Sequence, residues 1–193
     1  MSGIDAVIDA GRLSERLEVL ELRETEPGVW TWEAMRKTWA QVELDAGQRK
    51  NLFSSVGIGA RNASLVLRRQ EFTLHNALRW KGHHLFLTAI LPRGRGHLDV
   101  TAALVRPETV QLVLDGEGQG VTFPGILTEK YLAHSQEWPM SVNDLELVLV
   151  VPKAITLRPG RLVECLGAAW EVLVPHELDE FKNEYEIGRR AEL

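Results

Sequence analysis

The histidines are the first residues whose type could carry chemistry, and their spacing is uninformative. His83 and His84 are adjacent, so on a strand their side chains would point to opposite faces and could not readily bind one metal ion together. The others lie at scattered positions without HExxH or HxH spacing: His75, His97, His134 and His176. The sequence therefore predicts no metal site and no cofactor.

The cysteine and glycine motifs are equally weak. Cys165 is the only cysteine and lies in an apolar strand pattern, which indicates an inert buried thiol rather than a nucleophile. Gly116, Gly118 and Gly120 look like a phosphate-binding loop, but two acidic residues lie among them and the residues that follow favour a strand. There is no GxSxG motif and no Cys–His signature. We therefore expect a protein that is not an enzyme and has no catalytic residues.

Charge is unevenly distributed along the 193 residues. Residues 1–105 carry 14 Lys/Arg against 12 Asp/Glu, a net of +2, whereas residues 106–193 carry 8 against 15, a net of −7. Between Arg36 and Arg95 the counts are 11 basic and 3 acidic residues. Such a stretch could face phosphate groups or an acidic protein surface, or it could be an ordinary solvated face. The cations that we expect to face a partner or DNA are Arg49, Lys50, Arg68, Arg69, Arg93 and Arg95.

The elements that must position these residues are strands, because apolar residues alternate through most of the chain. We expect a mainly β fold of barrel-like or sandwich-like modules with short helices, in two similar units. The apolar pattern of Leu65 and Leu67 returns 83 residues later, that of Trp39–Val42 returns 84 later, and that of Gly82 and Leu85 returns 85 later. An internal duplication explains this repeat, although any two β-meanders with alternating apolar residues could be aligned in the same way.

Turn residues predict where the units divide. We expect an N-terminal arm or short helix over residues 1–12, a first module over 13–96, and a second module over 97–193 that ends in an acidic tail. The tail could be a docking arm or a further strand, and the residues from Ala154 to Leu157 are expected to form a strand. The predicted core anchors are Trp32, Trp39, Trp80 and Trp170. No apolar run is long enough to span a bilayer and no signal-peptide layout opens the chain, so a cytosolic product is expected.

The first module resembles the head–tail joining proteins of tailed bacteriophages, which are also called head-closure or stopper proteins. The resemblance covers about residues 13–92 and is carried by Arg16–Arg23, the Glu26-Pro-Gly turn, Trp30-Thr-Trp-Glu33, Thr38-Trp-Ala-Gln-Val-Glu43, Leu65–Arg69 and Trp80–Leu87. The tryptophan strand is the most specific part. The family usually has a Thr-His before the strand that ends in arginine, where this chain has Asn62-Ala-Ser64, and its members often have one barrel rather than two units.

The resemblance implies a virion structural protein of the head–tail neck, made in the cytoplasm of the bacterial host. It implies a homo-oligomeric ring of six or twelve copies that contacts a portal or adaptor protein and a tail or tail-terminator protein. Contact with packaged DNA would be transient and non-specific, and no membrane would be involved. A tail terminator or a duplicated-barrel component of a baseplate hub remains the alternative. A small-molecule binding or enzymatic β-domain is the third reading, and it would need a deep pocket with converging polar groups.

Overall fold

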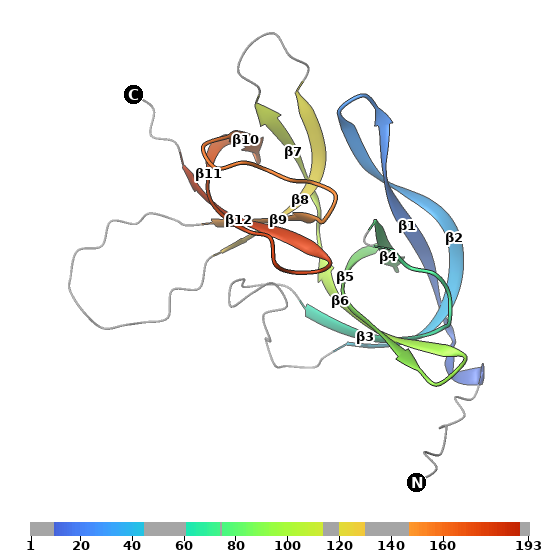
Figure 1. Ribbon diagram of the computed structural model, residues 1–193. Helices are drawn as coiled ribbons and strands as arrows, with labels where there is room; N and C mark the ends of the chain where they lie inside the picture. Colours follow the sequence, from blue (N-terminus) through green and yellow to red (C-terminus); the bar gives the residue numbers. More distant parts are fainter. Residues whose placement is uncertain (1–9, 45–60, 74, 114–119, 130–146, 190–193) are drawn as a thin grey trace, which may run out of the picture. The chain divides into compact units, whose positions relative to one another are not determined.

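The computed structural model describes residues 10–44, 61–73, 75–113, 120–129 and 147–189 (Figure 1). Strands make up most of these residues, which confirms the mainly β fold class, and η1 (Ala10–Arg12) is the only helical element among them. The strands are β1 (Glu15–Glu26), β2 (Val29–Leu44), β3 (Arg61–Arg68), β4 (Asn76–Trp80), β5 (His83–Arg93), β6 (His97–Val105), β7 (Glu108–Val113), β8 (Val121–Glu129), β9 (Leu147–Pro152), β10 (Leu162–Cys165), β11 (Ala168–His176) and β12 (Lys182–Arg189).

The chain divides into two compact units. The first contains described residues 10–23, 32–44 and 61–106, and the second contains residues 24–31 with those from Pro107 onward. The sequence analysis placed the boundary after residue 96, but this position lies in the β5–β6 hairpin, where Arg93 pairs with His97. The division instead falls just before Pro107, a residue that lacks a backbone N–H and cannot continue a ladder.

In the first unit six strands pair in a closed ring. The order is β1-β4-β5-β6-β3-β2, and pairing between β1 and β2 returns to the start. The inward residues are apolar and fully buried, among them Leu17 and Val19 on β1, Leu65 on β3 and Leu85 on β5. On β1 Glu18 lies between the buried residues Leu17 and Val19, as in a half-buried strand, but Val19 and Leu20 are both buried, so the alternation is interrupted there.

The second unit repeats this order. Its strands pair as β7-β10-β11-β12-β9-β8, with β8 returning to β7, so each strand occupies the same place in its ring as the strand six positions earlier. The core of this unit contains Phe123, Leu149, Tyr185 and Ile187, all fully buried.

The two rings also share the pairing register of three strands, which are β4, β5 and β6 in the first unit and β10, β11 and β12 in the second. Leu78 pairs with Leu85 in the first unit, and the residues 85 positions later, Val163 and Trp170, pair in the second. The ladder β5–β6 has a bulge between Leu87 and Ala89, and β11–β12 has one between Val172 and Val174, again 85 positions later. A bulge re-aims a strand and is a specific feature of a fold. The offset of 85 that the sequence predicted for this region is therefore the one that the ladders show.

The connections β4–β5 and β10–β11 are matching tight turns. Lys81 and Gly82 have φ angles of 49° and 82°, and Leu166 and Gly167 have φ angles of 50° and 73°. Positive φ at both central residues is typical of the hairpin turns that suit the right-handed twist of their strands.

The predicted offsets are wrong by one residue for two other strands. Leu65 on β3 pairs with Val100 on β6, and Leu149 on β9 pairs with Tyr185 on β12. Val100 and Tyr185 are 85 residues apart, as β6 and β12 are throughout. Leu65 therefore corresponds to Leu149, an offset of 84 residues rather than the predicted 83. Likewise Val42 pairs with Leu65 and Leu127 pairs with Leu149, which gives 85 rather than 84 for β2 and β8.

One expectation for the second unit is corrected, and one of two alternatives for its tail is confirmed. The residues from Ala154 to Leu157 form no strand, although Ile155 and Leu157 are buried. Side chains replace the ladder there, because the Asn183 side-chain amide donates to the Ile155 carbonyl (2.8 Å) and the Leu157 N–H donates to the Tyr185 hydroxyl (3.0 Å). Of the two alternatives for the acidic tail, its described part forms a further strand, since β12 pairs with both β11 and β9.

Candidate interaction surface

Four of the predicted cations meet at one end of the first unit. Arg68 and Arg93 both pair with His97, from β3 and β5 on either side of β6. The Arg69 N–H donates to the Gly96 carbonyl (2.8 Å), which holds the end of β3 against the β5–β6 turn that carries Arg95. We call Arg68, Arg69, Arg93 and Arg95 the arginine end, and all four residues are exposed.

Most of the positive charge at the arginine end is not neutralised. Arg93 forms an ion pair with Asp99 (3.0 Å). Arg68, Arg69 and Arg95 form no ion pair with any described residue. Because exposed guanidinium groups bind phosphate and carboxylate groups through paired N–H donors, this end can bind either kind of anion.

A fifth arginine, which the sequence analysis did not single out, lies against the segment that follows Arg69. The Arg36 guanidinium donates to the Glu71 carbonyl (2.7 Å) and the Gln70 side-chain oxygen (3.3 Å), and it lies 5.9 Å from the centre of the Phe72 ring. Arg36 thus fastens the β3–β4 connection to β2. Nothing in the local sequence pairs residues 34 positions apart, so only the fold reveals this contact.

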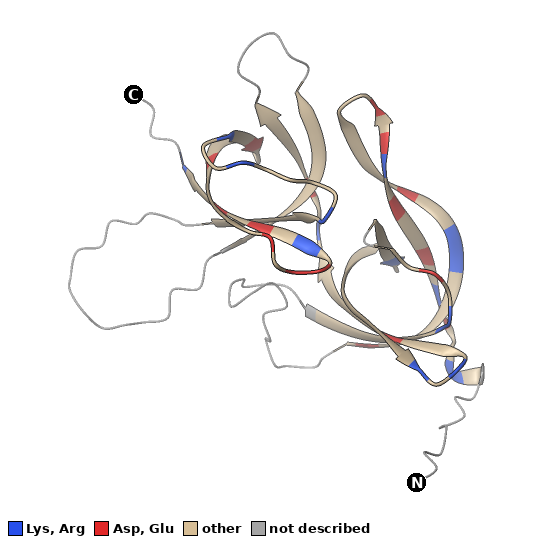
Figure 2. Cartoon of the chain, viewed as in Figure 1, with Lys and Arg blue, Asp and Glu red and all other residues tan. Residues whose placement is uncertain are grey.

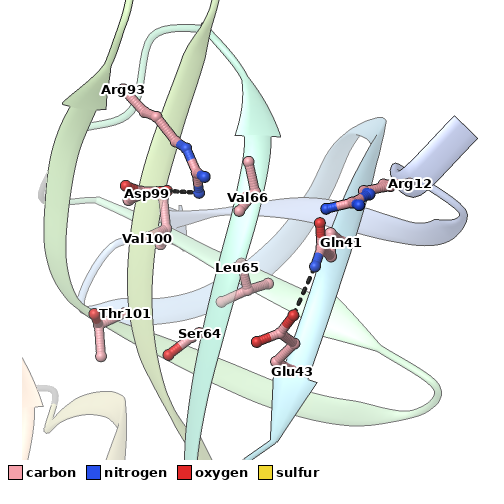
Figure 3. Close-up of a pocket in the computed structure, with 10 residues that line it drawn as sticks. All are labelled: Arg12, Gln41, Glu43, Ser64, Leu65, Val66, Arg93, Asp99, Val100 and Thr101. Carbon is pink, nitrogen blue, oxygen red and sulfur yellow. Dashed lines mark hydrogen bonds and ion pairs between the residues drawn. The ribbon is translucent and has the colours of Figure 1, made fainter. Parts of the chain in front are cut away.

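A surface hollow of about 460 Å³ adjoins the arginine end on the outward face of β2, β3 and β6 (Figure 3). Arg12 and Arg93 lie on either side of Val66. Polar groups in the hollow bind each other, since Gln41 donates to Glu43 (2.6 Å) and Arg93 binds Asp99. The hollow thus extends the surface of the arginine end.

The residues considered first for chemistry are poorly placed for it. Burial, and secondarily the charge of Arg79, lowers the pKa of His84 to about 4, so this imidazole is neutral at pH 7. Burial raises the pKa of the Cys165 thiol to about 11, which disfavours the nucleophilic thiolate. No group of three or more His, Cys, Asp or Glu side chains within the described ranges could hold a metal ion.

Of the four tryptophans predicted as core anchors, one is buried, two are half-buried and one is exposed. Trp170 is buried, and its ring N–H points to the Cys165 carbonyl (3.4 Å). Trp39 was a predicted core anchor but is 54% exposed, because its neighbour Ala40 is the inward residue at that point of β2. Trp32 and Trp80 are half-buried.

Several predicted sites lie outside the described residues. They include Arg49 and Lys50, residues 1–9 of the N-terminal arm, and Gly116 and Gly118.

The two units differ in charge even though their strand order is the same (Figure 2). The described residues of the first unit include 13 Lys/Arg and 7 Asp/Glu, a net of +6, and those of the second include 5 and 11, a net of −6. The described chain therefore has a basic unit and an acidic unit.

In comparisons with known proteins, no family model, no curated protein and no solved structure matches the chain. Within its described part, no helix has the length and apolar character needed to cross a membrane.

Proposed function

We propose that this chain is a virion structural protein of the head-to-tail connector of a tailed bacteriophage. In this proposal it acts as a head-closure (stopper) or adaptor ring, which joins the portal to the tail and helps to retain packaged DNA. The residues from Trp30 to Glu43, the most specific part of the family resemblance, lie in one continuous strand, β2. The proposal assigns the protein no enzymatic role.

The matching strand rings support the architectural part of this proposal. We infer that both rings are small barrels that arose by internal duplication, because they share strand order, turn conformation and bulge position. A closed ring of strands leaves few open edges, so such modules present loops, turns and short strand segments to their neighbours. This suits a subunit that is surrounded by copies of itself and by other virion proteins in a ring of six or twelve copies.

The observation that carries the functional part is the arginine end. Three exposed arginines without an ion pair among the described residues lie together at one end of the first unit, where the Arg69 N–H donates to the Gly96 carbonyl. A connector must bind an acidic neighbour or hold the phosphate backbone of DNA at the neck, and clustered arginines suit both tasks. The acidic second unit would repel DNA and thus let it pass.

A second candidate function is another tail component, such as a tail terminator or a baseplate-hub protein. The tandem matching units favour it, since two similar modules in one chain double the symmetry that a ring of subunits offers to its partners. This candidate predicts rings on isolated tails rather than on DNA-filled heads.

Charge reversal tests the connector proposal. The variant Arg68→Glu/Arg69→Glu should assemble DNA-filled heads that fail to join tails, because it replaces two attractive charges with two repulsive ones at the arginine end. The matched control is Arg158→Glu/Arg189→Glu, which reverses two exposed arginines of the second unit. The measurement is the fraction of tailed particles in negative-stain images of complemented lysates, with circular dichroism of each purified protein to show that it folds.

We expect the control to form tailed particles at the wild-type frequency. The fraction of tailed particles should be at least ten-fold lower for the arginine-end variant. Normal tail joining by a folded Arg68→Glu/Arg69→Glu protein would contradict the proposal.

A further inference from the structure

The two strand rings carry opposite charges at corresponding turns (Figure 2). The ladders β5–β6 and β11–β12 share one pairing register at an offset of 85 residues. At this offset Arg93 and Arg95 of the first ring correspond to Leu178 and Glu180 of the second. The same place in the fold thus accepts either sign of charge, so the fold itself requires neither the arginines nor the acidic residues.

The connection between β11 and β12 presents a fixed acidic surface. We call Glu177, Asp179 and Glu180 the acidic end, and all three residues are exposed. Lys153 donates to the Glu177 carbonyl (2.6 Å), and the Phe181 N–H donates to the Asp179 carboxylate (2.7 Å), which holds the connection in shape. Glu180 forms no ion pair with any described residue. Even with Lys153 counted, the three carboxylates leave the acidic end net negative.

Each of the two ends also exposes a leucine. Leu91 lies two residues before Arg93 on β5, hence on the same side of the strand, and is 63% exposed. Leu178 lies within the acidic end and is fully exposed, at 104%. A leucine in water gains free energy when it packs against another polypeptide, whereas the phosphate backbone of DNA offers it no apolar surface. The leucines therefore favour a protein over DNA as the partner of each end.

We propose that the arginine end docks on the acidic end of a second copy of this chain. Arg68, Arg69 and Arg95 have no ion-pair partner among the described residues, and guanidinium groups bind carboxylates through paired N–H donors. Leu91 of one copy and Leu178 of the next add apolar contact within this charged rim. The inference rests on the proposed function, because it names the acidic neighbour that the arginine end binds in the connector ring.

This contact is head-to-tail, since two different surfaces of the chain meet. Each copy in a pair keeps one end free for a further neighbour, and repetition generates a ring if the rotation between copies closes. The charges also disfavour wrong pairings, because two arginine ends or two acidic ends repel each other. A chain with one basic and one acidic end thus specifies the order in which its copies join.

Two variants that each block one end test the contact. Arg93→Ser/Arg95→Ser removes charge from the arginine end, and Leu178→Ser/Glu180→Ser changes the corresponding positions of the acidic end. Glu177 and Asp179 stay unchanged because they accept the hydrogen bonds that hold their connection. The matched control is Arg189→Ser, which removes an exposed arginine at the other end of β12.

Sedimentation velocity measures the self-association of each purified protein, with circular dichroism to show that it folds. The wild type and the control should associate as concentration rises, and each end variant alone should associate at least ten-fold more weakly. An equimolar mixture of the two end variants should form a dimer that does not grow further. The intact acidic end of one variant binds the intact arginine end of the other, and the two remaining ends are blocked.

The outcomes separate the docking site from the proposed function. If the wild type associates and both end variants associate like the control, or if their mixture forms no dimer, the docking site is wrong and a ring built through other surfaces stands. If Arg93→Ser/Arg95→Ser assembles normally but loses binding to duplex DNA in fluorescence anisotropy, the arginine end is a DNA contact instead. A wild type that stays monomeric at the highest soluble concentration also overturns the docking site. The proposed function fails separately, if particles made without the protein are complete and infectious.

Discussion

At the scale of single residues, burial makes the His84 side chain unsuited to act as an acid, a base or a metal ligand. His84 is 9% exposed, its ring lies 5.2 Å from that of Trp32, and its Nε2 atom has no hydrogen-bond partner among the described residues. A charged imidazole in this place would lose its water without gaining a partner. Of the two adjacent histidines, His83 is exposed and His84 packs in the interior of the unit.

The lowered pKa of His84 predicts a loss of stability in mild acid. The unfolded chain binds a proton at this residue below its usual pKa of 6.5, whereas the folded chain binds one only below about 4. Unfolding therefore takes up a proton between these values, and the free energy of unfolding should fall by about 3 kcal/mol as pH drops from 6.5 to 4. Chemical denaturation of the wild type and of His84→Phe across this range measures the effect as a difference between the two proteins.

The neighbouring residue supplies the control for this experiment. His83 is exposed, so His83→Phe should keep the wild-type dependence on pH, while His84→Phe should lose this part of it. If the free energy of unfolding of His84→Phe and of the wild type fell equally with pH, the lowered pKa of His84 in the folded protein would be contradicted.

At the scale of elements, the matching turns carry strain that a substitution can relieve. Leu166 has a φ of 50° and is 69% exposed, so its left-handed backbone conformation is strained and no burial of its side chain offsets the strain. Leu166→Asn should raise the free energy of unfolding by about 1 kcal/mol, because asparagine tolerates this conformation. Thermal unfolding of the variant should show a raised melting temperature.

Another exposed leucine separates backbone strain from a simple change in surface polarity. Leu178 is fully exposed, at 104%, and does not have a positive φ, so Leu178→Asn should leave the melting temperature unchanged. Equal shifts in the two variants would contradict the strain explanation.

The sequence predicted the elements better than their registers, for a physical reason. The offset of 85 was correct where a glycine turn and alternating residues fix the faces, as at Gly82 and Gly167. On β9, Val148, Leu149, Val150 and Val151 are all buried, so alternation could not show which residues face inward. A slip by one residue exchanges the two faces of a strand, and the predicted offset had this error.

The residues after β9 show a second limit of the pattern. Ile155 and Leu157 are apolar and alternate, which favours a strand, but the side chains of Asn183 and Tyr185 bind their backbone from about 28 residues away. Such long-range side-chain hydrogen bonds leave no local signal. The same holds for Trp39, whose β-forming neighbourhood indicated a strand correctly but not the side of it that faces outward.

At the scale of the whole molecule, the uneven charge was readable from sequence, whereas the meeting of the arginines was not. Counting residues shows that the basic side chains concentrate between Arg36 and Arg95. That Arg68 and Arg93 flank one residue, His97, follows only from the pairing of β3 and β5 with β6.

The measurement that tests the central claim most directly is electron microscopy of phage particles assembled without this protein. Deleting its coding sequence should leave capsids that package DNA and then lose it, alongside free tails, and supplying the protein in trans should restore tailed, DNA-filled particles. Complete infectious particles in its absence, or defects confined to the tails while the heads remain full and stable, would contradict the connector account.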